Sequence, residues 1–186
     1  MDELMAALRA DYDRHAGRSL SLPIAGAVVW TVAGLAGLLL PQRPATLTLL
    51  FSTGAIFPIA LAVARLLRER LMDNPNPLAK LMALCILMVN LLWALHLSLL
   101  PREPDYVPLS LGISLGLHWI VFSWIIRHPL GVIHAVLRTA LATGLWWLLP
   151  EHPIPAVAAA GVGSYLYSIV ALATRRPNLA PAGAVA

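Results

Sequence analysis

The sequence contains little charge. Only 12% of its 186 residues are Lys, Arg, Asp or Glu, whereas soluble domains carry about 25%, and 59% of the residues are hydrophobic. The mean hydropathy is +0.77. So few charged side chains cannot cover a globule of this size, which excludes a water-soluble domain for most of the chain. No basic stripe interleaved with aromatic residues is present either, so the formal charge of +4 does not indicate a nucleic-acid partner.

Cysteine and catalytic motifs are also scarce. The single cysteine, Cys85, lies within an apolar run and can form neither an internal disulfide nor a cysteine metal site. The sequence lacks HExxH, CxxC, GxSxG, a Walker loop and GxGxxG. His96 and His134 are expected at different depths, which disfavours a pair of axial haem ligands. We therefore expect no cofactor, no metal and no catalytic residues, although the sequence does not exclude an enzyme.

Long apolar runs dominate what is present. A membrane-spanning helix needs about 20 mainly apolar residues, and six stretches satisfy this: 20–40, 45–65, 78–100, 107–126, 129–149 and 154–174. In hydrocarbon the backbone must satisfy its own hydrogen bonds, so runs of this length are expected to be helical. The pattern predicts an all-α, integral membrane six-helix bundle made of three antiparallel hairpins.

Three nearly identical strings each lie between the two apolar runs of a predicted hairpin. They are LLPQRP (39–44), LLPREP (99–104) and LLPEHP (148–153). The first proline of each string disfavours continuation of the preceding helix, and the second suits the first turn of the next. Each string therefore predicts a tight turn between antiparallel helices, and all three turns are expected at the same side of the bilayer.

The distribution of Lys and Arg predicts the orientation. With the N-terminus in the cytoplasm, the three outer turns carry only Arg43 and Arg102. The inner segments then carry ten basic residues: Arg9, Arg14, Arg18, Arg65, Arg68, Arg70, Lys80, Arg127, Arg175 and Arg176. The positive-inside rule thus favours both termini in the cytoplasm. We expect an inner-membrane protein with multiple spans.

Two terminal segments flank the predicted spans. In residues 2–16, apolar side chains recur at helical spacing opposite charged ones, which predicts a short amphipathic helix on the inner surface or against the bundle; a solvated tail is the alternative. The last residues, PNLAPAGAVA, are typical of a disordered tail. The predicted organisation is a cytoplasmic N-terminal helix (1–19), a six-span domain (20–174) and a cytoplasmic tail (175–186).

Arg138 is the sharpest candidate for a functional residue. No Asp or Glu occurs in any of the six spans, and Arg138 is expected near the bilayer midplane. A charge there costs about 2.5 to 3.5 kcal/mol on insertion scales, so something must offset it. Water, backbone carbonyls, Asn90, Thr139, a lipid phosphate or an anionic ligand would serve. A packing seam without any ligand is the alternative.

Two histidines accompany Arg138 in the prediction. His118 is expected at the same depth on the neighbouring span, and His134 lies one helical turn from Arg138 on the same face. His118 also shares a stripe with Ser110 and Ser114, which either lines a polar cavity or bonds within the bundle. We identify Arg138, His118, His134 and Asn90 as candidate substrate-binding residues.

Small residues four positions apart form further patterns. Gly112 and Gly116 form a GxxxG, and the same spacing joins residues 33 and 37 and residues 156, 160, 164 and 168. Such stripes let helices approach closely, so they are interpreted as packing faces. Pro58 is expected to kink the second span.

Several stretches resemble a family of uncharacterised bacterial membrane proteins of similar length, a domain of unknown function. They are LRADYDRHAG (8–17), IFPIALAVARLL (56–67), DNPNPLAKL (73–81) and PDYVPLSLGISLGLHW (104–119). The resemblance implies several membrane spans and no particular activity.

Three functions remain open at this point. The first is a small transporter-like or ligand-binding protein with a polar cavity at the midplane, taking an anionic small molecule or a lipid head group. The second is a structural or accessory membrane subunit without a substrate, which associates with copies of itself or with another protein. The third is a membrane-embedded enzyme or cofactor carrier. All three have the lipid bilayer as a partner.

Overall fold

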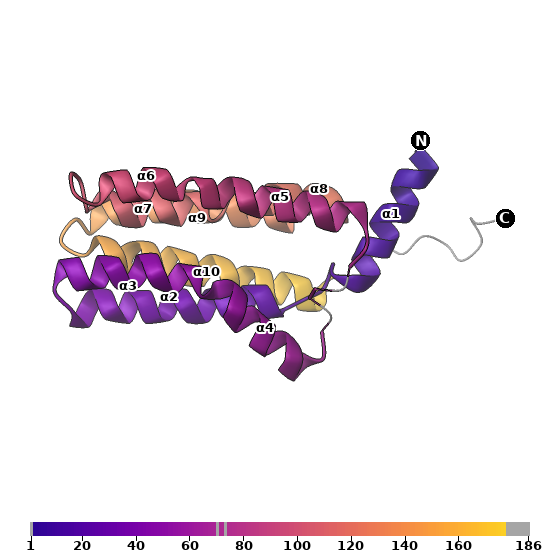
Figure 1. Cartoon of the computed structure of the whole chain (residues 1–186), viewed down its shortest axis with the longest axis horizontal. Helices are drawn as coiled ribbons and strands as arrows, with labels where there is room; N and C mark the ends of the chain where they lie inside the picture. The colour runs from indigo at the N-terminus through magenta and orange to yellow at the C-terminus, as the bar shows by residue number, and fades with distance from the viewer. Residues whose placement is uncertain (1, 70, 73, 178–186) are drawn as a thin grey trace.

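The computed structural model describes residues 2–69, 71–72 and 74–177. Within these residues the chain forms ten helical segments and no strand, which confirms the all-α prediction (Figure 1). Residues 178–186, most of the predicted C-terminal tail, lie outside the described residues. The helix predicted over residues 2–16 is present as α1 (Asp2–His15).

The apolar runs form the other helical segments. The bounds are α2 (Ser21–Leu39), α3 (Gln42–Gly54), α4 (Ile56–Leu67), α5 (Pro77–Leu91), α6 (Trp93–Leu99), α7 (Tyr106–Ser114), α8 (His118–Ile126), α9 (Leu130–Leu148) and α10 (Pro153–Thr174). The pairs α5–α6 and α7–α8 each make one long helical run. Five helices in the described residues are long and apolar enough to cross a membrane, and α3–α4 makes a sixth if this bent pair is one span.

The three Leu-Leu-Pro strings lie at one end of the bundle, as the turns after α2, α6 and α9 (Figure 1). Pro153 is the first residue of α10 and Pro44 lies in the first turn of α3, where a missing N–H costs nothing. Pro104 instead ends the turn just before α7. At the opposite end lie α1, the α4–α5 connection and the end of α10 (Figure 1).

The continuous helices α2, α9 and α10 form the centre of the fold. Helix α10 packs extensively on both α2 and α9. The close approach uses glycine, since a Cβ at Gly26 would lie 2.3 Å from Cζ of Tyr165. Ala33 of α2 and the small residues 156, 160, 164 and 168 of α10 are buried. The small-residue stripes are thus used for packing within this chain.

The three spans between α2 and α9 are interrupted near their middles. Helices α3 and α4 meet at 49° around Ala55, three residues before Pro58. Helices α5 and α6 are separated by Leu92, whose N–H bonds to the carbonyl three residues earlier. Between α7 and α8, the N–H groups of Gly116 and Leu117 make the same tighter bonds. Short 3₁₀ stretches inside helices often mark hinges.

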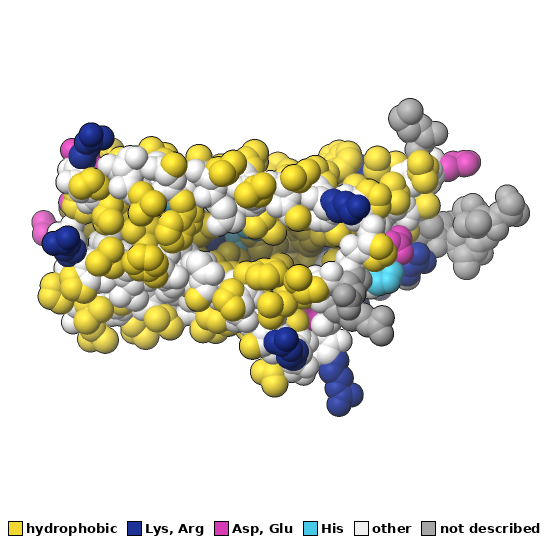
Figure 2. Space-filling view, viewed as in Figure 1, with side chains coloured by type: hydrophobic (Ala, Val, Ile, Leu, Met, Phe, Trp, Pro, Cys, Tyr) yellow, Lys and Arg dark blue, Asp and Glu magenta, His cyan; other side chains and the backbone are white. Residues whose placement is uncertain are grey.

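A hollow separates two rows of helices. Helix α5 packs mainly on α8, α6 and α1, whereas α4 packs on α2 and α3. Figure 2 shows the hollow between the α5–α6 row and the α3–α4 row, with a histidine side chain at its bottom. Hydrophobic side chains cover most of the surface on either side of it (Figure 2).

Polar contacts fasten the end that carries α1. The carboxylate of Asp13 and the guanidinium of Arg175 are both buried and form an ion pair, and Arg175 also donates to the carbonyl of Gly17. Arg175 is therefore part of the folded body, although it was expected to begin the tail. Glu69 accepts hydrogen bonds from the N–H groups of Leu20 and Ser21 at the start of α2, at 2.9 and 3.2 Å.

Candidate cationic site between the helices

Arg138 lies on the inward face of α9 with none of its surface exposed. Its Nε–H donates to the backbone carbonyl of Gly112 on α7 across 2.6 Å. Gly116 gives its aliphatic part room, since a Cβ there would lie 2.9 Å from Cδ of Arg138. A side chain at position 116 would therefore press on the arginine, so the GxxxG of residues 112–116 admits Arg138 as well as a neighbouring helix.

Two aromatic rings flank the guanidinium. Its central carbon lies 4.6 Å from the centroid of Trp30 on α2 and 5.2 Å from that of Tyr165 on α10. Ring faces attract cations, and the attraction grows when water is excluded. Although the Tyr165 side chain also attracts the guanidinium, Nη1 and Nη2 of Arg138 have no hydrogen bond of good geometry in the described residues.

His134 lies one turn from Arg138 and is fully buried. Its Nδ1 and the hydroxyl of Ser168 share a hydrogen bond of 2.7 Å. The ring stacks on Trp119 of α8, with centroids 4.2 Å apart and planes at 15°, and meets the edge of Tyr165. These contacts fix the ring, while Nε2 keeps no hydrogen-bond partner in the described part of the chain.

His118 begins α8, directly after the interruption that follows α7. It lies within electrostatic range of both Arg138 and His134. Unlike His134, it is only partly buried, and its Nδ1 has no hydrogen-bond partner among the described residues. The structure therefore brings three of the four candidate residues together, from the middle parts of two spans that are adjacent in sequence.

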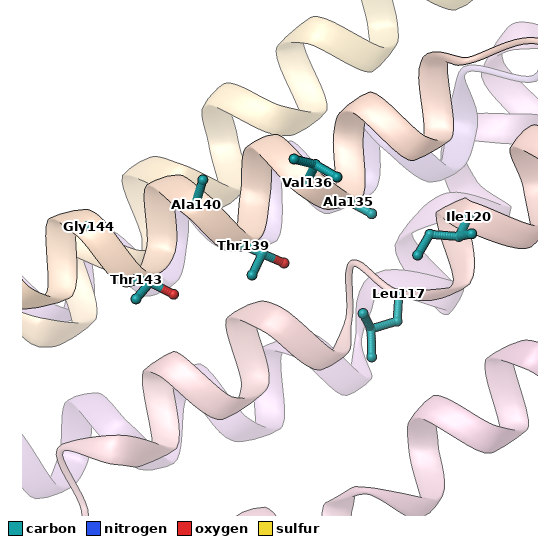
Figure 3. A pocket seen from close by; sticks show the side chains of 8 residues that line it. All are labelled: Leu117, Ile120, Ala135, Val136, Thr139, Ala140, Thr143 and Gly144. Carbon is teal, nitrogen blue, oxygen red and sulfur yellow. The ribbon is translucent and has the colours of Figure 1, made fainter.

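Asn90, the fourth candidate, does not join this group by any hydrogen bond that the structure shows. It is exposed on α5, and its amide donates to the carbonyl of Ile86 in its own helix at 2.8 Å. Thr139 lines a groove between α9 and the start of α8, with a volume of about 620 Å³ (Figure 3). Thr143 and Leu117 line the same groove, so it is bordered by the interruption that separates α7 from α8.

The serine stripe of α7 serves His96 instead of His118. Ser110 contacts Nδ1 of His96 at 3.0 Å, and Ser114 contacts Nε2 at 3.2 Å. Both ring nitrogens of His96 are thereby occupied, which fixes α6 against α7. Among the three histidines of the spans, only His118 and His134 keep a ring nitrogen without a partner in the described residues.

Sequence reasoning missed the aromatic part of this site. Trp30, Trp119 and Tyr165 surround Arg138 and His134, but their spacing along the chain carries no local pattern. Tryptophan usually lies at the membrane interfaces. The position of these amphipathic rings in the middle of apolar runs is therefore the signal that could have identified them. No group of three or more potential metal ligands occurs in the described residues.

Comparison with known proteins places the chain in a family. Neither a search of curated proteins nor a search of solved structures finds a match. A model of a family of unknown function, DUF7010, matches residues 5–175, which include every helix that contributes to the site. The match confirms the predicted resemblance to a family without a known activity. The chain therefore belongs to the family of unknown function DUF7010.

Proposed function

We propose that this protein is a transporter-like or ligand-binding protein of the bacterial inner membrane. It spans the bilayer six times with both termini in the cytoplasm, and it binds a small anion or an anionic head group at Arg138, His118 and His134. The span count treats the bent pair α3–α4 as one span. The orientation is supported by the ten basic residues in the segments predicted to face the cytoplasm, against two in the Leu-Leu-Pro turns.

The observation that carries the proposal is the set of unpartnered nitrogens around Arg138. By strict hydrogen-bond geometry, Nη1 and Nη2 of Arg138, Nε2 of His134 and Nδ1 of His118 are buried without a partner in the described residues. The Tyr165 side chain nevertheless interacts with the guanidinium of Arg138, and the backbone of Ser164 interacts with His134. Buried polar atoms in native proteins nearly always have partners, and each exception needs an explanation. An anion supplies negative charge and several acceptor atoms, so it would satisfy the donors of all three residues.

Access to this site is supported by the interrupted spans. Transporter sites commonly lie near the midplane next to broken helices, and here three consecutive spans are interrupted. Gly116 belongs to one interruption and touches Arg138. The hollow beside α5 reaches toward the middle of the bundle (Figure 2). Because Arg138 has no exposed surface, this conformation is closed, and ligand binding requires movement at these interruptions.

The second candidate, a structural subunit, is favoured by that same burial. A dry arginine held by a carbonyl and two aromatic rings can serve as a packing element. That function would use exposed small-residue faces to bind another protein, yet the stripes on α2 and α10 are buried within this chain. We therefore favour the ligand-binding function.

A panel of anions tests the proposal. Purified protein in detergent would be unfolded by heat with sodium salts of chloride, nitrate, formate, acetate and inorganic phosphate at constant ionic strength. A bound anion at 100 times its Kd stabilises the folded state by about 2.7 kcal/mol. We expect a saturable rise of the unfolding temperature with at least one anion, and its loss in Arg138→Met. The exposed Arg14, replaced by Gln, is the control.

The stability of Arg138→Met itself separates the two functions. Burial of a charge without a counterion is costly, so its replacement by an apolar side chain of similar volume is expected to be neutral or stabilising. A binding site therefore predicts that the variant, without any anion, unfolds at the same or a higher temperature. A variant that unfolds at a lower temperature, with no anion effect on the wild type, would instead establish Arg138 as a packing element.

A further inference from the structure

A second charged pocket lies at the far end of the bundle from the Leu-Leu-Pro turns. It is lined by one face of α1 and by the residue that ends α8: Asp2, Glu3, Met5, Ala6, Arg9 and Arg127. Its volume is about 330 Å³, within the usual range of small-ligand sites, about 300 to 1,000 Å³. No residue of the Arg138 site contributes to it, so the two sites are separate.

Arg9 is held in place at this pocket by Trp124. The central carbon of its guanidinium lies 4.2 Å from the centroid of the Trp124 ring, near the end of α8. Its Nε is buried and has no hydrogen-bond partner in the described part of the chain. Burial and the neighbouring charge of Arg127 both lower the pKa of Arg9, so two guanidinium groups act on one another here.

Arg127 is placed by the backbone. It ends α8 in the left-handed conformation, with φ of 51°, and its side chain is exposed. Helix ends usually place glycine in this conformation, because a Cβ is unfavourable there by roughly 1 to 2 kcal/mol. Arg127 adopts this conformation although a Cβ disfavours it, and it lines the pocket together with residues of α1.

Asp2 and Glu3 supply the opposite charge. Both are exposed in the first turn of α1 and line the same pocket as the arginines. None of these four charged side chains forms an ion pair with another residue that the structure describes. The pocket thus offers two cations and two anions that do not neutralise each other by direct contact.

We propose that this pocket binds the head group of an aminophospholipid such as phosphatidylethanolamine. Arg9 and Arg127 take the phosphate, and Asp2 and Glu3 take the ammonium. The inference rests on the membrane placement proposed above, which puts the end of α8 at the level of the lipid head groups. Guanidinium groups suit phosphate oxygens, and a primary ammonium can donate hydrogen bonds to carboxylates.

The pairing of charges makes the ligand specific. Phosphatidylglycerol carries the phosphate but no ammonium, so it would leave Asp2 and Glu3 facing added negative charge. Phosphatidylcholine carries a quaternary ammonium without an N–H, so it cannot donate to the carboxylates. Trp124 is 52% exposed beside Arg9, which leaves its ring available to the region between head group and acyl chain.

Competitive lipid retention tests this inference. The full-length protein would be placed in vesicles containing equal amounts of phosphatidylethanolamine, phosphatidylcholine and phosphatidylglycerol with the same acyl chains. Native mass spectrometry after extraction then counts the retained lipids. We expect phosphatidylethanolamine to be retained above both others, and this excess to fall about tenfold in Arg9→Gln or Arg127→Gln, as for loss of a charge-assisted hydrogen bond.

Two further variants complete the experiment. Arg14→Gln, on the same helix but outside the pocket, should retain lipids as the wild type does. Asp2→Asn with Glu3→Gln, on an exposed turn where folding is not at risk, should remove the preference over phosphatidylcholine and increase retention of phosphatidylglycerol. Inorganic phosphate at millimolar concentration should not displace phosphatidylethanolamine, because it lacks the ammonium.

Equal retention of all three lipids, or a preference for phosphatidylglycerol in the wild type, would overturn the inference. Displacement of the lipid by inorganic phosphate would also overturn it, and would identify a simple anion site. Loss of the lipid preference while anions still stabilise the protein through Arg138 would refute this inference alone. Failure of the anion experiment would leave the lipid result unaffected.

Discussion

Gly161 of α10 packs directly on the indole of Trp30 of α2. A Cβ at position 161 would lie 2.8 Å from Cδ2 of Trp30, closer than real Cβ contacts come. The same indole faces the guanidinium of Arg138 at 4.6 Å. Gly161 of α10 therefore positions the indole of Trp30 on α2, and that indole faces the guanidinium of Arg138 on α9.

Gly161→Ala should consequently destabilise the protein and disturb the Arg138 site. Trp30 is fully buried, so its rigid ring cannot move away without displacing neighbours. Overpacking of this kind typically costs about 1 to 3 kcal/mol. We expect a lower unfolding temperature in detergent. Gly163→Ala on the same helix is the matched control, because a Cβ there meets nothing within 4 Å; equal losses in both variants would contradict the packing explanation.

Removal of either partner of the buried Asp13–Arg175 ion pair should be severely destabilising. The side chains are 1% and 2% exposed, respectively, and loss of one partner of a buried pair typically costs about 3 to 5 kcal/mol. Asp13→Asn and Arg175→Met should each lower the unfolding temperature strongly, and Asp13→Leu combined with Arg175→Met should restore much of it.

The control is Arg14→Gln, which breaks only an exposed contact with Asp11, worth less than about 1 kcal/mol. A double variant as unstable as the sum of the single ones would refute this account.

Glu69 should make the stability of α2 depend on pH. Partial burial alone would raise the pKa of Glu69, but hydrogen bonds from Ser19, Leu20 and Ser21 outweigh it and hold the pKa below the ordinary 4.5. A lowered carboxyl pKa contributes stability above the ordinary pKa, and this contribution is lost as the pH falls through the lower, folded-state value. We expect the unfolding temperature to decrease when the pH is lowered below about 4.5.

Glu69→Gln should weaken that pH dependence and lower the free energy of unfolding by about 1 kcal/mol near neutral pH. An unchanged acid response in this variant would exclude Glu69 as its source.

His96→Leu should loosen α6 from α7 at moderate cost. The substitution removes both interhelical hydrogen bonds, to Ser110 and Ser114, but each serine hydroxyl can then donate to a carbonyl of its own helix. Because the serines are not left without partners, we expect a loss of about 1 to 2 kcal/mol in the free energy of unfolding. Ser98→Ala, which removes only an exposed bond within α6, should be neutral. A neutral His96→Leu would show that these two bonds do not hold the helices together.

The sequence predicts the helices of this protein better than their interruptions. Runs of about 20 apolar residues predict membrane-spanning helices, and paired prolines predict the turns between them, so the approximate helix bounds follow from local chemistry. The tighter turns at Leu92 and at Gly116–Leu117 have no proline beside them. They depend on contacts with other helices, such as that between Gly116 and Arg138, which no local pattern records.

The candidate site follows a similar division. Arg138, His118 and His134 could be associated from the sequence because two of them share a helix face and the third has a matching depth on the next span. Asn90 had the right chemistry, but its amide is bonded to its own helix. The aromatic rings and the carbonyl of Gly112 come from α2, α7 and α10, and their convergence depends on helix packing that residue spacing alone does not define.

The partners Asp13 and Arg175 are 162 positions apart, one near the start of the chain and the other directly after the last helix. During synthesis Asp13 leaves the ribosome before Arg175. Their ion pair can therefore form only after α10 has been translated and inserted. A chain that stops short of residue 175 lacks the guanidinium that pairs with this buried carboxylate. The pair should thus couple the stability of the newly made protein to complete synthesis of α10, and we expect truncated products to be less stable.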